Sequence, residues 1–561
     1  MPVEGAAAPW ILFFSISDGV SRARTITARG AVLSEAWQRG TTEVRNLVKR
    51  RQIDVRWLRI DHVDVIEKMT WAELRERLKS TKRNYFRFGI SLDAACRNAF
   101  LETELNGNAM LNGGADIAWC EVNDRNFLRY AKRRHGLDAV DFGDQQAVWT
   151  FSSRGLLMGD GTLVHRLNGP GLDMGRRPVM DKIGPPDNAG RRALEKLTLA
   201  DVERLIASSS AYLAGEVKED GQFRYGWHPC FDRPINTYNT LRHASSLYAT
   251  IEGWDVTRDD KVKAAIDRSL GYLTQNLIKP VTLPSGEPAA VLVEINGEIK
   301  LGGNAVCILA LVKYTELTAD QQYLPLLDQL AAAILHMQNP ETGGFVHVLQ
   351  YPSLEVKDTF RTIYYDGEAA FGLMRLYGLT QNPRWINAVE RALGHFIDKQ
   401  HWKAHDHWLS YCVNEITKHR PERAYFEFGI RNFVGHLNFV MERITTFPTL
   451  LELMMAAEQM VSRLKSDPKN AELLQQVDVA KFYDALEKRA HYMLNGHFWP
   501  ELAMFYARPE AIVGSFFIRH HAFRVRIDDV EHYLSGYVAY RKYLLSAATN
   551  DQLGREANRS S

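Results

Sequence analysis

One stretch decides the fold of this 561-residue chain: Tyr364-Tyr365-Asp366-Gly367-Glu368-Ala369-Ala370-Phe371-Gly372-Leu373-Met374-Arg375-Leu376-Tyr377. Two carboxylates open an otherwise apolar run with helical spacing, so acidic groups lie at the N-terminus of a predicted helix, beside the positive end of its dipole. A turn over residues 378–383 follows, and residues 385–399 again have the pattern of an amphipathic helix. The stretch therefore predicts a helical hairpin.

The same pattern occurs in two upstream segments, which makes it an internal repeat. The turn threonines Thr257, Thr318 and Thr380 align the three copies at spacings of 61 and 62 residues. Continued along the chain, the pattern predicts twelve helices, which begin near Leu199, Tyr238, Asp259, Leu301, Gln322, Asp366, Arg384, His405, Glu422, Pro448, Ala480 and Asp528. Six sequential hairpins bury every apolar face when they close into a ring of six inner and six outer helices.

One polar position recurs in the three copies. His243, Asn304 and Asp366 each lie fourteen residues before the turn threonine of their copy. A purely structural position would be expected to keep an apolar or small residue, so we interpret these side chains as a polar lining. Because Asn and Asp are good helix caps, a capping role for the same position is the alternative.

The first third of the chain has a different organisation. Residues 10 to about 180 alternate strand-like and helix-like segments, including a strand over residues 55–65, a helix over residues 71–79 and a hairpin over residues 147–167. We expect a separate α+β domain of unknown role over residues 1–180, and a linker in the glycine- and proline-rich residues 168–188. This part of the sequence contains no phosphate loop, dinucleotide fingerprint or spaced metal ligands.

The composition is that of an ordinary soluble protein, with 45% apolar residues, 11% aromatic residues and a net charge of +2. Neither a secretory signal nor a membrane span is evident, and the five cysteines are widely spaced and odd in number. We therefore expect a cytoplasmic protein with reduced thiols and no membrane partner. Basic clusters such as Lys82-Arg83 could meet an anionic ligand, but most such clusters are solvated faces, so no nucleic-acid partner is expected.

Two runs carry a resemblance to a known superfamily. The run from Gly302 to Leu311, which leads to Thr318, and the helix that begins Asp366-Gly367-Glu368 resemble the α/α-toroid superfamily of six-hairpin glycosidases. That superfamily also includes sugar 2-epimerases and toroidal polysaccharide lyases. The resemblance covers residues 195–548 and implies a mainly α protein, in which a C-terminal (α/α)6 toroid follows the smaller α+β domain. It also implies an active site where the inner helices begin, a saccharide or glycoconjugate as substrate, and no cofactor.

The first functional hypothesis is a glycoside hydrolase-like enzyme with paired carboxylates. Hydrolysis needs one protonated and one ionised carboxyl group. By position, the resemblance provides Asp366 or Glu368 for one member of this pair and, across the ring, Asp406, Asp528 or Asp529 for the other. Aromatic rings stack on sugar faces and polar groups orient them, so the candidate substrate-binding residues are Tyr238, Arg242, Asn304, Trp227, Tyr365 and Arg524.

A sugar epimerase or polysaccharide lyase is the alternative enzyme. Abstraction of a proton next to a carbonyl or carboxylate needs a base near neutral pKa, with cations beside the developing enolate. His243 and His521 are the candidate bases, since each has arginines close by in the sequence. A third hypothesis is a non-catalytic ring that binds a glycan or a peptide.

The segment 516–532 holds the densest set of ionisable residues in the chain. Burying so many charges is costly without partners, so the segment lines a cavity or forms a charge network between two hairpins. Asp528 and Asp529 could equally cap the last helix and pair with Arg524 and Arg526. The histidine pairs at 405/407 and 520/521 lack the third spaced ligand of a zinc signature, so no metal site is expected.

Overall fold

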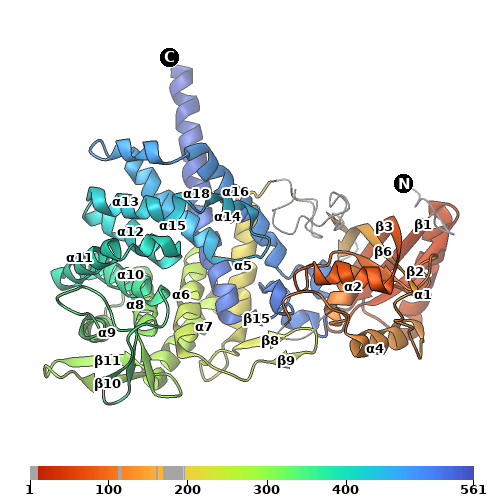
Figure 1. The fold of residues 1–561 in the computed structure, drawn as a ribbon, viewed down its shortest axis with the longest axis horizontal. Coiled ribbons are helices and arrows are strands. Elements are labelled where there is room, and N and C mark those ends of the chain that lie inside the picture. The colour runs from red at the N-terminus through yellow and green to blue at the C-terminus, as the bar shows by residue number, and fades with distance from the viewer. Residues whose placement is uncertain (1–9, 112–116, 160–161, 168–193, 195, 561) are drawn as a thin grey trace.

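The computed structural model describes residues 10–111, 117–159, 162–167, 194 and 196–560, and its larger part is a closed ring of helices (Figure 1). The inner helices are α6 (Thr240–Thr257), α8 (Leu301–Thr318), α10 (Tyr364–Thr380), α12 (His407–His419), α15 (Thr449–Lys465) and α18 (Ile527–Ser560). Each packs against the next along the chain, and α18 closes the ring by packing against α6. The predicted linker at residues 168–188 lies outside the described residues.

The outer layer has one helix for each inner helix. These are α5 (Leu199–Glu216), α7 (Asp260–Tyr272), α9 (Leu324–His336), α11 (Pro383–Asp398), α13 (Arg423–Val434) and α16 (Val479–Tyr492). α5 packs against both α18 and α6, so the first outer helix joins the two ends of the ring. The mainly α toroid predicted from the sequence is confirmed, and all twelve helices begin within two residues of the predicted positions.

The patterns of burial explain why the helices could be recognised locally. The inner helix α8 is buried almost all round, whereas α11 buries one face, which includes Trp385, Ile386 and Phe396. Four of the six outer helices, α5, α7, α11 and α16, begin at a side-chain cap, such as Asp259 for α7 and Asn382 for α11. Caps and apolar faces are short-range signals, so the sequence alone places the starts of the helices.

The internal repeat corresponds to equivalent helix ends. α6, α8 and α10 end at the three aligned threonines. In each case the next residue adopts the left-handed conformation, at Arg258 (φ 51°), Ala319 (φ 58°) and Gln381 (φ 54°). A left-handed residue just after a helix turns the chain sharply, so the threonine period marks the turn between inner and outer helices.

Short antiparallel strands cover the end of the ring where the inner helices begin. β15 (Val525–Arg526) pairs with β8 (Gly226–His228), which pairs with β9 (Arg233–Pro234). β12 (Glu298–Lys300), β13 (Val348–Gln350) and β14 (Glu355–Asp358) form a second sheet, and β10 (Ile278–Thr282) pairs with β11 (Pro288–Leu292). β15 runs directly into α18 and β12 into α8, so these sheets fix the entry of the inner helices.

The N-terminal region is a smaller α+β unit beside the ring (Figure 1). Its antiparallel sheet has the order β2-β1-β3-β6-β4-β5, with β7 on β6. The strands are β1 (Trp10–Ser17), β2 (Arg24–Gly30), β3 (Trp57–Thr70), β4 (Gly89–Ser91), β5 (Ala99–Phe100), β6 (Ala147–Gly159) and β7 (Thr162–Leu167). Four helices pack with them, α1 (Leu33–Arg51), α2 (Trp71–Lys79), α3 (Glu102–Gly107) and α4 (Asp124–His135).

The α+β region contacts the ring in part through the segment that holds residues 501–521. Met504 and Phe505 belong to the same apolar cluster as Phe13 and Phe151 of the sheet. Arg519, which is buried, pairs with Glu102 at 2.6 Å. The charge-dense segment therefore serves in part as a charge network between the two regions. Among the described residues, no helix combines the length and apolar character that crossing a membrane requires.

Candidate active site

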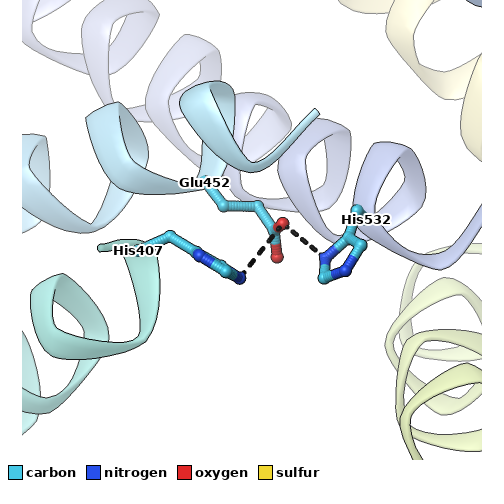
Figure 2. Close-up of side chains that lie close together, drawn as sticks. All are labelled: His407, Glu452 and His532. Carbon is cyan, nitrogen blue, oxygen red and sulfur yellow. Dashed lines mark hydrogen bonds and ion pairs between the residues drawn. The ribbon is translucent and has the colours of Figure 1, made fainter. Parts of the chain in front are cut away.

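Three side chains from three inner helices meet inside the ring, where those helices begin. His407 is the first residue of α12, Glu452 lies in the first turn of α15, and His532 lies near the start of α18. His532 Nδ1 is 2.8 Å from Glu452 Oε2, and His407 Nε2 is 4.0 Å from the same oxygen. Figure 2 shows the two imidazoles on either side of the carboxylate. Their ring centroids are 5.4 Å apart and their planes differ by 78°.

Asp406 holds His407 in place. One carboxylate oxygen of Asp406 caps α12 by accepting the Leu409 amide at 3.0 Å. The other oxygen lies 3.1 Å from His407 Nδ1. The two atoms are at ion-pair distance without forming a hydrogen bond, because Asp406 Oδ1 has no hydrogen-bond partner among the described residues. In the part of the chain that the structure describes, the buried Nε2 has no hydrogen-bond partner.

His532 differs from His407 in its charge environment. Burial alone would lower its pKa, but the carboxylates of Glu531 and Glu452 raise it to about 10. The side chain remains 22% exposed, whereas His407 and Glu452 are almost fully covered. Glu531 accepts a hydrogen bond from Ser245 at 2.7 Å, and burial raises the pKa of Glu531 to about 7. His532 is thus an imidazolium at neutral pH, ion-paired on its buried side.

Glu368 adds a carboxyl group that is protonated at neutral pH. Burial, and then the nearby charges of Asp406 and Glu531, raise its pKa to about 8. Its Oε2 forms no hydrogen bond within the described part of the chain. A Cβ atom on Gly302 of α8 would lie 1.7 Å from this oxygen, so only glycine leaves room for the carboxyl group.

Arginine–aspartate pairs border the cluster at the start of α18. Arg242 Nε is 2.7 Å from Asp528, and Arg524 donates to Asp529 at 3.1 Å. Burial opposes ionisation of Asp528, but Arg242 and Arg526 hold its pKa below the usual range. Burial and the charge of Asp528 raise the pKa of Asp529. The pairing of both aspartates with Arg524 and Arg526, given above as an alternative, is present in the structure.

The recurring polar position does not face the ring interior. His243 lies between α6 and α7, where its ring contacts the Tyr238 hydroxyl at 2.7 Å and Ser269 Oγ at 3.1 Å. Asn304 accepts the Leu292 amide and donates to the carbonyl of Lys300. Asp366 lies 3.3 Å from His347. The polar-lining interpretation of this position is wrong, and so is simple helix capping, because the side chains fix neighbouring segments to each inner helix.

The side chains that point into the ring lie two residues after the recurring polar position. Residues two apart on a helix project about 200° from each other, so Asp366 and Glu368 must face opposite sides of α10. The equivalent of Glu368 on α6 is Ser245, which donates to Glu531. The structure therefore brings Glu368 and Asp406 to the cluster, and places His243, Asn304 and Asp366 outside it.

The remaining predicted residues are divided between the rim and other surfaces. Arg242, Arg524 and Tyr365 lie near the cluster, since the first two hold Asp528 and Asp529, and Tyr365 is next to Gly302. Trp227 instead donates to Glu216 of α5 at 3.3 Å and packs beneath Arg508. His521 packs edge-to-face against His520 next to the α+β region, and burial and Arg524 lower the pKa of His521 to about 4. The hydroxyl of Tyr238 contacts His243 rather than the cluster.

The three central residues are also the potential metal ligands of the site. Among the described residues, the ligand atoms of His407, Glu452 and His532 come within 4.8 Å of one another. The fit to a metal ion is poor, because His532 Nδ1 and Glu452 Oε2 already satisfy each other at hydrogen-bonding distance. A metal ion at this position would have to displace that contact.

By position, the toroid resemblance points to His407, Glu452 and His532 among the polar residues at the inner-helix starts, but the sequence does not separate them from the other candidates there. His407, Glu452 and His532 lie at the helix starts that the toroid resemblance indicates, but they have no motif spacing, being 45 and 80 residues apart. One signal was available in the sequence, because Asp406 caps a predicted helix start and is followed directly by a histidine. Their convergence depends on closure of the ring.

No protein-family model and no curated protein sequence matches this chain. Solved structures do match it. A D-mannose isomerase is 12% identical, with 63% of this chain and 100% of that chain covered and a TM-score of 0.47. The cellobiose 2-epimerase from Bacillus thermoamylovorans B4167 is 12% identical, with coverages of 62% and 100% and a TM-score of 0.46.

A glycosidase is matched in the same range. The GH76A alpha-1,6-mannanase from Salegentibacter sp. HEL1_6 is 12% identical, with coverages of 61% and 100% and a TM-score of 0.43. These proteins are six-hairpin α/α toroids, as the resemblance in the sequence implies. At such low identity the likeness concerns the fold alone, and the ring of this chain is established by its own helix contacts.

Proposed function

We propose that this protein is a carbohydrate-active enzyme that transfers a proton at the carbon next to a sugar carbonyl, as an epimerase or isomerase. The observation that carries the proposal is the pair His407 and His532. They flank one carboxylate; the neighbouring carboxylates raise the pKa of His532, and the buried Nε2 of His407 has no hydrogen-bond partner among the described residues. A base and an acid on opposite sides of one site are what such a reaction requires.

His407 is the proposed base. Its Nε2 has the free lone pair, and Asp406 stabilises the imidazolium that forms when Nε2 takes the proton from carbon. The electrons of the broken C–H bond move toward the carbonyl and give an enediol. Because the base is buried, water competes little for its lone pair.

His532 is the proposed acid. Its imidazolium gives a proton to the carbonyl oxygen as charge develops there, or to the opposite face of the carbon as the intermediate collapses. A proton returned to the former carbonyl carbon, with loss of the proton from the neighbouring hydroxyl, gives an isomer. A proton added to the opposite face of the original carbon gives an epimer. The neutral carboxyl group of Glu368 is suited to donate a hydrogen bond to a sugar oxygen in the same site.

Glycoside hydrolysis is the second candidate, and Glu368 favours it. A carboxyl group with a pKa of about 8 is protonated at neutral pH, as a general acid must be, and Asp406 is close enough to influence its pKa. Under this hypothesis Glu368 protonates the leaving oxygen and Asp406 acts on the other face of the sugar.

Solvent exchange tests the proposal and separates the two candidates. The purified protein is incubated in D2O with D-mannose, D-glucose, cellobiose and short α- and β-linked oligosaccharides, and proton NMR follows the signals next to the anomeric carbon. For at least one sugar, we expect deuterium to replace the proton on the carbon next to the anomeric carbon. The His407→Asn and His532→Asn variants should lose this exchange. His336→Asn, a control on the outer face, should keep it. Release of reducing ends without deuterium uptake, dependent on Glu368, would instead establish the hydrolase.

A further inference from the structure

A pocket of about 520 Å³ lies where the α+β region meets the rim of the ring. One wall includes Lys79 and Lys82, which follow α2, together with Trp119. The backbones of Lys82 and Trp119 are paired by an antiparallel bridge, so this wall is fixed. The other wall is the segment from Phe439 to Thr445, which leads from α14 (Leu437–Glu442) toward α15. Its volume is in the range of small-molecule sites, and we refer to it as the basic pocket.

Two cations in the basic pocket lack acidic partners. Lys79 is paired with Glu76 at 2.7 Å. For Lys82 and Arg443, no carboxylate lies within 4.0 Å in the described part of the chain. Arg443 is oriented by donating from Nε to Thr445 Oγ1 at 2.7 Å. Glu442 also lines the pocket, so its carboxylate opposes the two cations in part.

The surroundings of these two cations add positive charge. Burial, Arg443 and Arg83 lower the pKa of Lys82, and no acidic group contributes to that shift. Burial, His521, Lys82, Arg83 and Arg443 lower the pKa of His520 to about 3. Lys82 and Arg443, which have no carboxylate within 4.0 Å among the described residues, repel each other, so a bound anion between them would be stabilised.

The walls of the pocket also present aromatic surface. Trp119 is 43% exposed and Phe439 is 38% exposed, although large aromatic side chains usually have most of their surface buried. The guanidinium of Arg443 lies 5.1 Å over the Phe439 ring, and His436 packs against the same ring with centroids 4.4 Å apart. Both aromatic side chains are thus placed beside the cations, where a ring attached to an anionic group would lie.

We propose that the basic pocket binds a small molecule that carries a phosphate group on a ring, with the phosphate between Lys82 and Arg443 and the ring against Trp119 and Phe439. Two cations match the charge of a phosphate monoester, and the arginine fork suits its oxygens. A phosphorylated sugar fits both features. This site uses none of the residues of the His407 cluster, so the proposal stands independently of the proposed catalytic function.

Calorimetric titration of the full-length protein tests the proposal. The probes are inorganic phosphate, glucose 6-phosphate and glucose, in chloride buffer at constant ionic strength. We expect saturable binding of both phosphates and none of glucose at equal concentration. Lys82→Gln and Arg443→Gln should each weaken phosphate binding roughly tenfold, as expected for loss of a charge-assisted contact. Lys49→Gln, a control on the exposed face of α1, should leave it unchanged.

Two further variants keep the test decisive. Glu442→Gln removes the opposing carboxylate and should tighten phosphate binding, a gain that misfolding does not produce. Trp119→Ala should weaken glucose 6-phosphate but not inorganic phosphate. Absence of saturable phosphate binding, or equal losses in Lys82→Gln and Lys49→Gln, would overturn the proposal. Equal affinity for the two phosphates, unchanged in Trp119→Ala, would overturn its ring contact.

Discussion

Two groups of inner helices use their polar residues differently. α6, α8 and α10 share the threonine repeat, whereas α12 and α18 do not. In α6, α8 and α10 the aligned position carries His243, Asn304 and Asp366, which fix neighbouring segments. In α12 and α18, the proposed acid–base residues His407 and His532 lie at the helix starts, outside any alignment on the turn threonines. The aligned position thus reports architecture, whereas the two histidines that we propose as acid and base lie on helices outside the repeat.

The largest expected effect comes from the histidines outside the repeat. His407→Asn and His532→Asn should each lower the deuterium exchange rate by roughly 10²–10⁴-fold, the usual contribution of a positioned acid or base. Because His532→Asn leaves buried Glu452 without its ion-pair partner, this variant should also unfold at a lower temperature, so exchange is compared where both variants are folded. Exchange rates and melting curves of the same preparations check this, and near-normal exchange in either variant would contradict the proposed roles.

His243, inside the repeat, should behave in the opposite way. His243→Asn leaves Tyr238 and Ser269 without their shared partner and should lower the free energy of unfolding by about 1–3 kcal/mol, with catalysis unchanged in the folded protein. Burial lowers the pKa of His243 to about 4. Between about pH 4 and the usual value near 6.5, the unfolded state binds more protons at this residue, so its contribution to stability falls as the pH is lowered. Denaturant titrations at pH 5 and 7.5 should show a stronger pH dependence in the wild type than in the variant.

The carboxylate of Glu452 gives the two histidines that we propose as acid and base different charge environments. Glu452→Gln removes one of the charges that raise the pKa of His532, so this pKa should fall by about one unit or more. Since the acid must be protonated, His532 would then lose its function at lower pH. NMR titration of the histidine ring signals, assigned with His532→Asn, measures the shift, and Glu341→Gln is the exposed control. An unchanged pKa of His532 would show that its 2.8 Å contact with Glu452 does not stabilise the imidazolium.

The smallest effect concerns the helix ends that define the repeat. Ala319 adopts φ 58° after α8, so Ala319→Gly should stabilise the protein by about 0.5–1 kcal/mol. Ser466 follows α15 at φ −97°, where glycine brings no such relief and costs backbone entropy. Ser466→Gly should therefore destabilise slightly. Chemical denaturation of the two variants measures the change in the free energy of unfolding of each. Changes of the same sign would contradict this distinction between the ends of α8 and α15.

Sequence by itself determined the twelve helices, because the information for each is local. Caps such as Asp259, the apolar faces, and the turns after Thr257, Thr318 and Thr380 all act within a few residues. The same local patterns predicted the hairpin of β6 and β7 and the helix α2 in the α+β region. They also placed candidate residues at the correct end of each inner helix.

Only the tertiary structure decided which of those residues meet. The rotation of each inner helix turns Asp366 outward and Glu368 inward, although both lie in the first turns of one helix. Closure of α18 onto α6 then brings His532 within reach of Glu452 and His407, across 125 residues of sequence. Helix rotation and ring closure are set by packing among many distant side chains, and for that reason no local pattern contains them.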